Sequence, residues 1–185
     1  SDKIKPDALK ALNILKSMNI NSVLLSGDHK SIVKKIAEKL GILSYLAEIL
    51  PEDKAREIKK LKSENALVGM VGDGVNDAIA LAEADVGFSL ATGSGVAIET
   101  ADVTLIRNTM MSIPVAILLS RKVLKKIKEN LFFAFFYNTI GIPLAAFGLL
   151  NPMIAGAAMA FSSVSVITNS LLLKKWKPIF KGEEL

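Results

Sequence analysis

The feature that most constrains how this chain can fold is a pair of long uncharged runs near its C-terminal end. Residues 131–150 are twenty consecutive uncharged residues, and residues 152–173 are twenty-two more. A bilayer core about 30 Å thick needs roughly 20 apolar residues in a helix, so each run is long enough to cross it. A soluble helical core would rarely need two such runs back to back. We therefore predict a two-helix transmembrane hairpin that lies in membrane lipid.

Basic residues stand on both sides of this hairpin, whereas its short connection around Asn151 carries no charge. The basic residues before the first run are Arg121, Lys122, Lys125, Lys126 and Lys128, and those after the second are Lys174, Lys175, Lys177 and Lys181. By the positive-inside rule, we expect both ends of the hairpin in the cytoplasm. We expect the membrane itself to be the cell membrane.

Charge and cysteine content exclude several other classes of protein. Residues 1–107 hold 14 basic and 15 acidic side chains, whereas residues 108–185 hold 9 and 3, so the positive net charge comes from the membrane part. We therefore expect no nucleic acid partner. The sequence has no cysteine, which excludes a disulfide scaffold and any thiolate metal site within this chain.

The first part of the chain alternates short apolar runs with amphipathic stretches. The apolar runs occupy residues 22–25, 46–50, 66–71, 86–90 and 103–106, and the amphipathic stretches occupy residues 6–18, 30–40 and 51–63. This alternation predicts an α/β fold with a Rossmann-like, mostly parallel sheet. Ligands of such sheets bind beyond the carboxyl ends of the strands, so the residues after each strand are candidates for a site.

Three polar motifs lie at the predicted strand ends and helix starts. They are Ser26-Gly27-Asp28, Lys54 in a first helical turn, and Gly72-Asp73-Gly74-Val75-Asn76-Asp77. Gly72 and Gly74 flank Asp73 in a tight turn whose amides can approach an anion. Asp73 and Asp77 are four residues apart, so a helical turn from Val75 would bring both carboxylates to one strand end, where they suit Mg²⁺. The alternative is an acidic turn that only caps the next helix.

Together, these motifs resemble the phosphorylation domain of the P-type ion-pumping ATPases, which has a haloacid-dehalogenase-like fold and uses ATP and Mg²⁺. The roles implied by the resemblance are phosphoryl contact for Ser26, Gly27 and Asp28, pairing with the phosphoryl group for Lys54, and Mg²⁺ binding for Asp73 and Asp77 beside Asn76. Asp2 and Lys5 resemble the family's D-x-x-K segment. Residues 91–95 resemble its small-residue turn.

Polar and sulfur-containing side chains recur in the membrane runs, where polar groups are costly and usually face a bundle interior or a pathway. They are Asn130, Tyr137, Asn138 and Pro143 at the first run, and Met159, Ser162 and Ser163 in the second. Met159 and Ser163 stack on one helix face at i and i+4, and a thioether suits Cu(I). Packing is the alternative, because methionine often fills gaps and serine and asparagine often join membrane helices.

The spacing N-x₆-Y-N-x₄-P followed by P-x₆-M-x₂-S-S resembles the last two membrane helices of the copper(I)-transporting P-type ATPases. The resemblance implies a transport site for Cu⁺ (or Ag⁺) made by Tyr137, Asn138, Met159 and Ser163. Asn130, Pro143 and Ser162 would be supporting residues, as Gly72 and Gly74 would be in the phosphoryl site.

Two motifs of that family are absent from the sequence: the D-K-T-G-T segment with its phospho-acceptor and the Cys-Pro-Cys of the ion site. We therefore expect the C-terminal part of a pump, catalytically incomplete alone, whose partner is the rest of the pump. Its expected parts are an incomplete phosphorylation domain (1–108), a linking helix (109–130), two membrane helices (131–150 and 152–173) and a tail (174–185). The alternative is a non-catalytic membrane-tethered subunit, or the product of a split gene, that binds Cu⁺ or another pump subunit.

Overall fold

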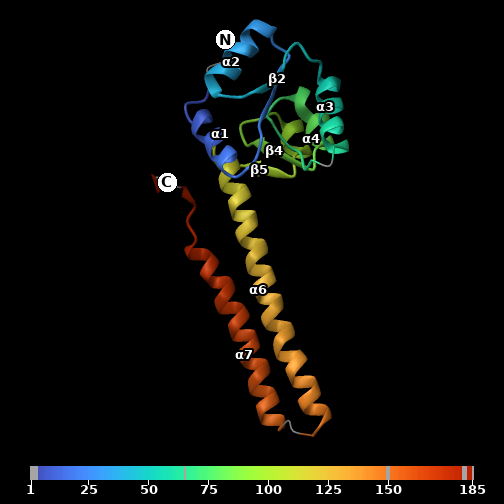
Figure 1. The fold of residues 1–185 in the computed structure, drawn as a ribbon, viewed down its shortest axis with the longest axis vertical. Helices are drawn as coiled ribbons and strands as arrows, with labels where there is room; N and C mark the ends of the chain where they lie inside the picture. Colours follow the sequence, from blue (N-terminus) through green and yellow to red (C-terminus); the bar gives the residue numbers. More distant parts are fainter. Residues whose placement is uncertain (1–3, 65, 149–150, 181–182, 185) are drawn as a thin grey trace. The chain divides into compact units, whose positions relative to one another are not determined.

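The computed structural model describes residues 4–64, 66–148, 151–180 and 183–184 (Figure 1). The chain divides into two compact units, Ser1–Pro114 and Val115–Leu185. The first is an α/β unit and the second consists mainly of two long helices.

Strands and helices alternate through the first unit. Its elements are α1 (Ala8–Ser17), β1 (Val23–Leu25), α2 (Lys30–Leu40), β2 (Ser44–Leu46), α3 (Pro51–Ser63), β3 (Gly69–Gly72), η1 (Val75–Asp77), α4 (Ala78–Glu83), β4 (Val86–Leu90), α5 (Gly95–Thr100) and β5 (Val103–Leu105). The predicted alternation is confirmed, including the helical turn that begins at Val75.

The strand predicted at residues 46–50 was wrong, because β2 ends where that run begins. Glu48 has a φ of +57°, which takes the backbone out of the extended region. The amides of Glu48 and Ile49 donate instead to the carbonyls of Asp28 and Ser26, at 3.0 and 3.3 Å. This segment therefore bonds to the loop that follows β1 and does not extend the sheet.

All strand pairs of the first unit are parallel, as predicted, but they form two sheets. One has the order β1-β2, with Val23 opposite Ser44, and the other has the order β3-β4-β5, with Gly69 opposite Val86. Among the described strands, β1 and β3 are each paired along one edge only. Each therefore leaves one row of backbone groups that could pair with another strand.

An apolar cluster fixes α3, α4 and α5 against β3. It is made of Ile58, Met70, Ala80, Leu81 and Ala97. Ile58 is 2% exposed and lies one turn after Lys54 on α3, so its burial sets which way the first turn of this helix faces. Burying such side chains contributes roughly 1.5–3 kcal/mol for each large one.

The start of the long helix α6 (Ser112–Ala146) is tied to the beginning of the chain. The carboxylate of Asp7 accepts hydrogen bonds from the hydroxyl of Thr109 and from the amide of Met111, the latter at 3.1 Å. Burial raises the pKa of the Asp7 carboxyl, but these hydrogen bonds outweigh it and hold the pKa below its usual range. Met111 and Ile113 are themselves buried, so α6 begins in packed structure.

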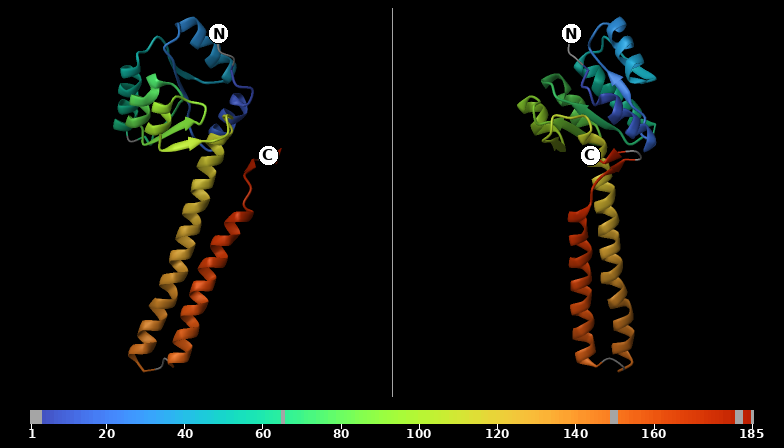
Figure 2. Two further views of the ribbon diagram at one scale, coloured as in Figure 1. Left: turned by 180° about the vertical axis from the view of Figure 1, so that it is seen from behind. Right: turned by 90° about the vertical axis from the view of Figure 1, so that its left-hand side faces the viewer.

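The second unit contains most of α6, then α7 (Pro152–Leu171) and a short η2 (Leu172–Lys175). α6 and α7 run side by side in both views of Figure 2. Asn151 caps α7 by accepting a hydrogen bond from the amide of Met153 at 2.9 Å. Two short strands, β6 (Ile179–Phe180) and β7 (Glu183–Glu184), pair near the end.

The expected linking helix and first membrane helix are one continuous helix of 35 residues. Pro143 lies inside this helix, which continues to Ala146. Within the described part of the chain, one helical segment, Gly156–Lys175, is long and apolar enough to cross a membrane. The membrane hairpin as a whole stays a prediction.

Candidate functional site

The first predicted motif forms a small hydrogen-bonded turn at the end of β1. The hydroxyl of Ser26 donates to the carboxylate of Asp28 at 3.0 Å, and the amide of Asp28 donates back to the Ser26 oxygen at 3.2 Å. Gly27 and Asp28 are exposed. A Cβ atom at Gly27 would lie 3.4 Å from the carbonyl of Ile49, so the turn is packed against the segment that precedes α3.

Lys54 and Asp77 form a largely buried ion pair. The Lys54 Nζ lies 2.7 Å from Asp77 Oδ1, and their side chains are only 14% and 16% exposed. Asp77 also accepts a hydrogen bond from the amide of Gly74 at 3.3 Å. A Cβ at Gly72 would lie 2.6 Å from the Cβ of Asp77, so only glycine fits there. The third motif and the lysine of α3 are thus brought together, as the sequence predicted.

Asp73 and Asn76 are exposed at the same strand end. The backbone carbonyl of Asp73 accepts a hydrogen bond from the amide of Ser94 at 2.7 Å. A Cβ at Gly93 would lie 2.9 Å from that same carbonyl oxygen. The small-residue turn between β4 and α5 is therefore packed directly against the loop that carries Asp73.

The carboxylates of this loop have different surroundings. The carboxylate of Asp77 forms an ion pair with Lys54, whereas the side chain of Asp73 is exposed. Hard oxygen donors of this kind fit Mg²⁺, which commonly takes one or two carboxylates and fills its other positions with water and substrate phosphate. Among the described residues, no group of three or more His, Cys, Asp or Glu side chains could hold a metal ion. A Mg²⁺ ion here would need oxygen ligands beyond the two aspartates.

Lys5, from the predicted D-x-x-K segment, bonds through its ammonium to the side chain of Asn108. Asp2 lies outside the described residues. This lysine therefore ties the start of the chain to the segment after β5, close to the bonds made by Asp7.

The second predicted site is a cavity of about 530 Å³ between α6 and α7. It is lined by Tyr137, Asn138, Gly141, Ile142, Ala145, Ala158, Met159, Ser162 and Ser163. The structure thus brings together the four predicted ligands and Ser162. Small residues on both helices leave the space that the larger side chains surround.

Two polar side chains of this cavity are held by their own helices. Asn138 donates through Nδ2 to the carbonyl of Ala134 at 2.9 Å, and the Ser163 hydroxyl donates to the carbonyl of Met159 at 3.2 Å. The Asn138 Oδ1 and the thioether of Met159, whose residue is 68% exposed, remain as donors for a metal ion. Sulfur is a soft ligand, and a site that contains it favours Cu⁺ over Mg²⁺ or Ca²⁺.

Two predicted supporting residues are not among those that line the cavity. Pro143 lies within α6, and Asn130 lies two turns before Tyr137. Asn130 bonds instead to α7: it accepts a hydrogen bond from Asn169 Nδ2 and donates one to Ser170 Oγ, both at 2.8 Å. Sequence reasoning missed Asn169 and Ser170, although Asn169 is an amide in a membrane run, where such groups are uncommon.

Comparison with known proteins identifies the family of this chain. A profile of the haloacid dehalogenase-like hydrolases matches residues 1–85. The chain is 51% identical over 177 residues to a copper-exporting P-type ATPase of Bacillus subtilis (strain 168). This match covers 96% of the present chain and 22% of the relative. It is 52% identical over 177 residues to a probable copper-importing P-type ATPase A of Enterococcus hirae, and this match covers 95% of the present chain and 24% of the relative. The chain therefore spans less than a quarter of the length of these relatives.

Solved structures agree with the sequence relatives. A zinc-transporting PIB-type ATPase in its E2.Pi state superimposes with a TM-score of 0.87 at 33% identity, covering 94% of this chain and 28% of that one. The catalytic domain of the CPx-ATPase CopB-B gives a TM-score of 0.59 at 40% identity over 63% of this chain and 47% of that one. The haloacid-dehalogenase-like fold is thereby confirmed. The chain belongs to the P-type ATPase family, and it matches copper-transporting members along nearly its whole length.

Proposed function

We propose that this chain acts as the C-terminal part of an ATP-driven pump that exports Cu⁺, or Ag⁺, across the cell membrane through an aspartyl-phosphate. The observation that carries the proposal is the cavity between α6 and α7, which is lined by Tyr137, Asn138, Met159 and Ser163. These residues come from two helices and include the soft sulfur donor that a Cu⁺ site needs. Both ends of the helix pair would lie in the cytoplasm, where their basic residues are favoured.

The phosphoryl site would form around the ion pair of the first unit. Lys54 lies 2.7 Å from Asp77 and can turn toward a phosphoryl group once that group brings its own negative charge. The turn from Ser26 to Asp28 would contact the phosphoryl oxygens through its hydroxyl and amides. Transfer of a metaphosphate-like group is accelerated mainly by positioning and by positive charge of this kind.

Magnesium fits the exposed carboxylate of Asp73, with Asp77 and Asn76 beside it. When bound, Mg²⁺ would neutralise charge on the phosphoryl group. Backbone hydrogen bonds would hold the ligands of the ion in place, because the amide of Ser94 fixes the carbonyl of Asp73 and the amide of Gly74 bonds to the carboxylate of Asp77. ATP itself would bind mainly to parts of the pump that this chain does not contain.

The aspartate that accepts the phosphoryl group would arrive on a strand from the rest of the pump. β1 and β3 each have one edge that pairs with none of the described strands. A parallel strand placed between them would join the two sheets into one. Its carboxyl end would then lie beside Ser26 and Asp73, which follow those two strands.

Transport by a completed pump tests the proposal. In the completed pump, this chain replaces the part that it matches in the Bacillus subtilis relative. Met159→Leu removes the soft donor with little change in volume, and Met153→Leu is the matched control because Met153 lies on α7 but not among the cavity-lining residues. We expect ATP-driven Cu⁺ uptake into inside-out vesicles to fall at least about tenfold with Met159→Leu. Equal uptake by both variants would contradict the proposed site.

A further inference from the structure

A cluster of polar side chains joins α6 to α7 outside the cavity. We call it the helix clasp, and it consists of Lys126, Glu129, Asn130, Asn169 and Ser170. Asn169 is its centre: Nδ2 donates to Asn130 at 2.8 Å and to Glu129 at 3.3 Å, and Oδ1 accepts from Lys126. Lys126 also pairs with Glu129 at 2.9 Å. One asparagine of α7 is thus bonded to three residues of α6.

The clasp and the cavity lie on the same faces of the two helices. Tyr137 follows Asn130 by seven residues on α6, and Ser163 precedes Ser170 by seven on α7. Seven residues are two turns less about 20°, and they advance a helix by about 10.5 Å. Asn130 with Ser170 and Tyr137 with Ser163 are therefore successive layers of one interface. A slide or rotation of α7 at the clasp would carry over to the cavity.

We propose that the helix clasp sets the register of α7 against α6 and thereby positions the metal ligands two turns away. Asn130 and Asn169 are positioning residues in this proposal and do not touch the ion. The inference rests on the proposed function of the cavity as a Cu⁺ or Ag⁺ site. It assigns a role to the asparagine of the N-x₆-Y-N motif that the cavity itself does not use.

The chemistry of the clasp favours this role over a second metal site. Its donors are amide, carboxylate and hydroxyl oxygens, which are hard ligands and select poorly for Cu⁺. The Lys126 ammonium also lies within bonding distance of Glu129 and Asn169, so a cation would have to displace a charge that is already in place. Each asparagine instead donates and accepts across the interface, which fixes position as well as contact.

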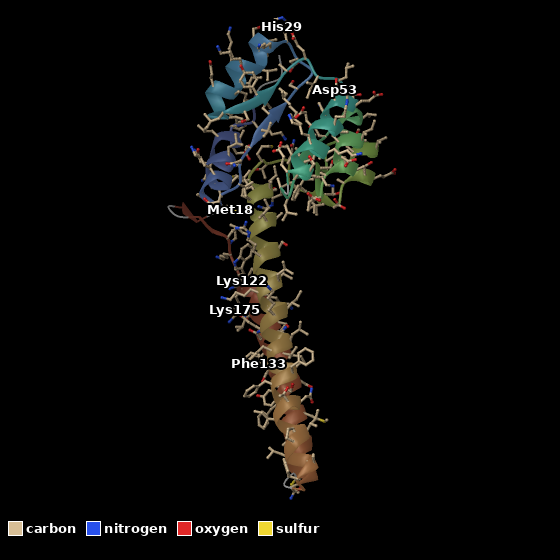
Figure 3. All side chains as sticks on the ribbon, turned by 45° about the vertical axis from the view of Figure 1, so that its right-hand side comes forward. Met18, His29, Asp53, Lys122, Phe133 and Lys175 are labelled. Atoms are coloured by element: carbon tan, nitrogen blue, oxygen red, sulfur yellow. The ribbon has the colours of Figure 1, made fainter. Side chains whose placement is uncertain are left out.

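The first arm of the test measures helix register without any metal. Because the chain has no cysteine, spin labels attached to Lys122→Cys on α6 and Lys175→Cys in η2 report a single distance (Figure 3). We expect Asn169→Leu and Asn130→Leu to shift or broaden the distance distribution in lipid nanodiscs. Thr168→Val, at the neighbouring exposed position of α7, should leave it unchanged. An unaltered distribution in Asn169→Leu would overturn the proposal.

A conservative variant separates lost register from failed folding. Asn130→Asp keeps the oxygen that Asn169 bonds, and the Ser170 hydroxyl can turn from the carbonyl of Val166 to donate to the new carboxylate. We expect its distance distribution to match that of the original chain. A broad distribution in Asn130→Asp, at unchanged helix content, would count against the bonding pattern on which the proposal rests.

The second arm measures Ag⁺ affinity in the completed pump, with Ag⁺ as the probe. Residues that orient metal ligands typically change affinity about 10- to 100-fold when removed, and we expect a loss of that size for Asn169→Leu but not for Thr168→Val. If Met159→Leu weakens Ag⁺ binding and Asn169→Leu does not, the clasp proposal fails alone. If Met159→Leu has no effect, the proposed function fails, whatever the spin labels report.

Discussion

At the scale of single residues, Gly93 and Gly95, which lie close together before and at the start of α5, differ in how tightly their surroundings are packed. A Cβ at Gly93 would lie 2.9 Å from the carbonyl oxygens of both Asp73 and Leu90, whereas a Cβ at Gly95 meets nothing within 4 Å. Backbone carbonyls cannot move away as the end of a flexible side chain can. Gly93 therefore supports the loop of Asp73, while Gly95 only begins a helix.

We expect Gly93→Ala to lower the free energy of unfolding of the chain by about 1–3 kcal/mol, because the added methyl overpacks this contact. Gly95→Ala should stay within about 0.5 kcal/mol of the original chain. Chemical unfolding followed by circular dichroism measures both. If the two substitutions changed the free energy of unfolding equally, the close contact between Gly93 and the carbonyl of Asp73 would not contribute to the stability of the chain.

Asp7 gives a prediction that depends on pH. Burial raises the pKa of Asp7, but the hydrogen bonds from Thr109 and Met111 outweigh it, so the pKa is lower in the folded chain than in the unfolded one. A lowered pKa contributes stability above the unfolded value, and this stability is lost as the pH falls through the folded value. We expect the original chain to be more stable than Asp7→Asn at neutral pH, with a gap that narrows below about pH 4. If the difference in stability between the original chain and Asp7→Asn did not change with pH, the lowered pKa of Asp7 would not be its cause.

Some residue contacts could be predicted from the sequence and others could not. The ends of parallel strands meet at one edge, so Lys54, Asp73 and Asp77 were expected near one another without knowledge of the full fold. The bonds of Asn169 to Asn130 could not be foreseen in this way, because 39 residues separate them and only the antiparallel run of two helices brings them together. The role of Gly93 was equally hidden, because it depends on a backbone carbonyl twenty residues away.

At the scale of elements, periodicity predicted the helices of several turns and missed the shorter ones. α2 and α3 match their predicted bounds, since each shows several turns of one apolar face. α4 and α5 have six residues each and were missed, because fewer than two turns show no clear period. The boundary expected at residue 130, where the charged residues end, stays a prediction, because α6 continues through this position without a break.

Because α6 is continuous from Ser112 to Ala146, we expect it to transmit movement of the phosphorylation domain to the membrane site. Replacing residues 121–125, which precede the clasp, with Gly and Ser should lower Cu⁺ transport per ATP hydrolysed in the completed pump. A helix-forming Ala and Glu replacement of the same length is the control and should preserve coupling. If both replacements couple equally well, the helix is not the mechanical link.

At the scale of the whole molecule, one chain carries both candidate sites, and we propose that other parts of the pump complete each of them. Among the described strands, each of the two parallel sheets has an edge without a partner, and the cavity between α6 and α7 offers one soft sulfur donor. The printed sequence contains no D-K-T-G-T segment and no cysteine. The pump proposed here therefore depends on residues from the rest of the protein at both places.

We expect the isolated chain to form no acyl-phosphate when incubated with labelled ATP and Mg²⁺, because it has no D-K-T-G-T aspartate to accept the phosphoryl group. The completed pump should form one, and Lys54→Ala should strongly reduce it. An acid gel measures both proteins side by side. A stable labelled band on the isolated chain would mean that another of its carboxylates accepts the phosphoryl group.

The central claim is that Met159 supplies sulfur to a Cu⁺ ion held between α6 and α7. Copper K-edge X-ray absorption of the completed pump, loaded with one Cu⁺ in the membrane site, tests it most directly. Met159→Leu should remove one sulfur neighbour from the copper spectrum, while Met153→Leu should leave the spectrum unchanged. An identical count of sulfur neighbours in the original pump and in Met159→Leu would contradict the account.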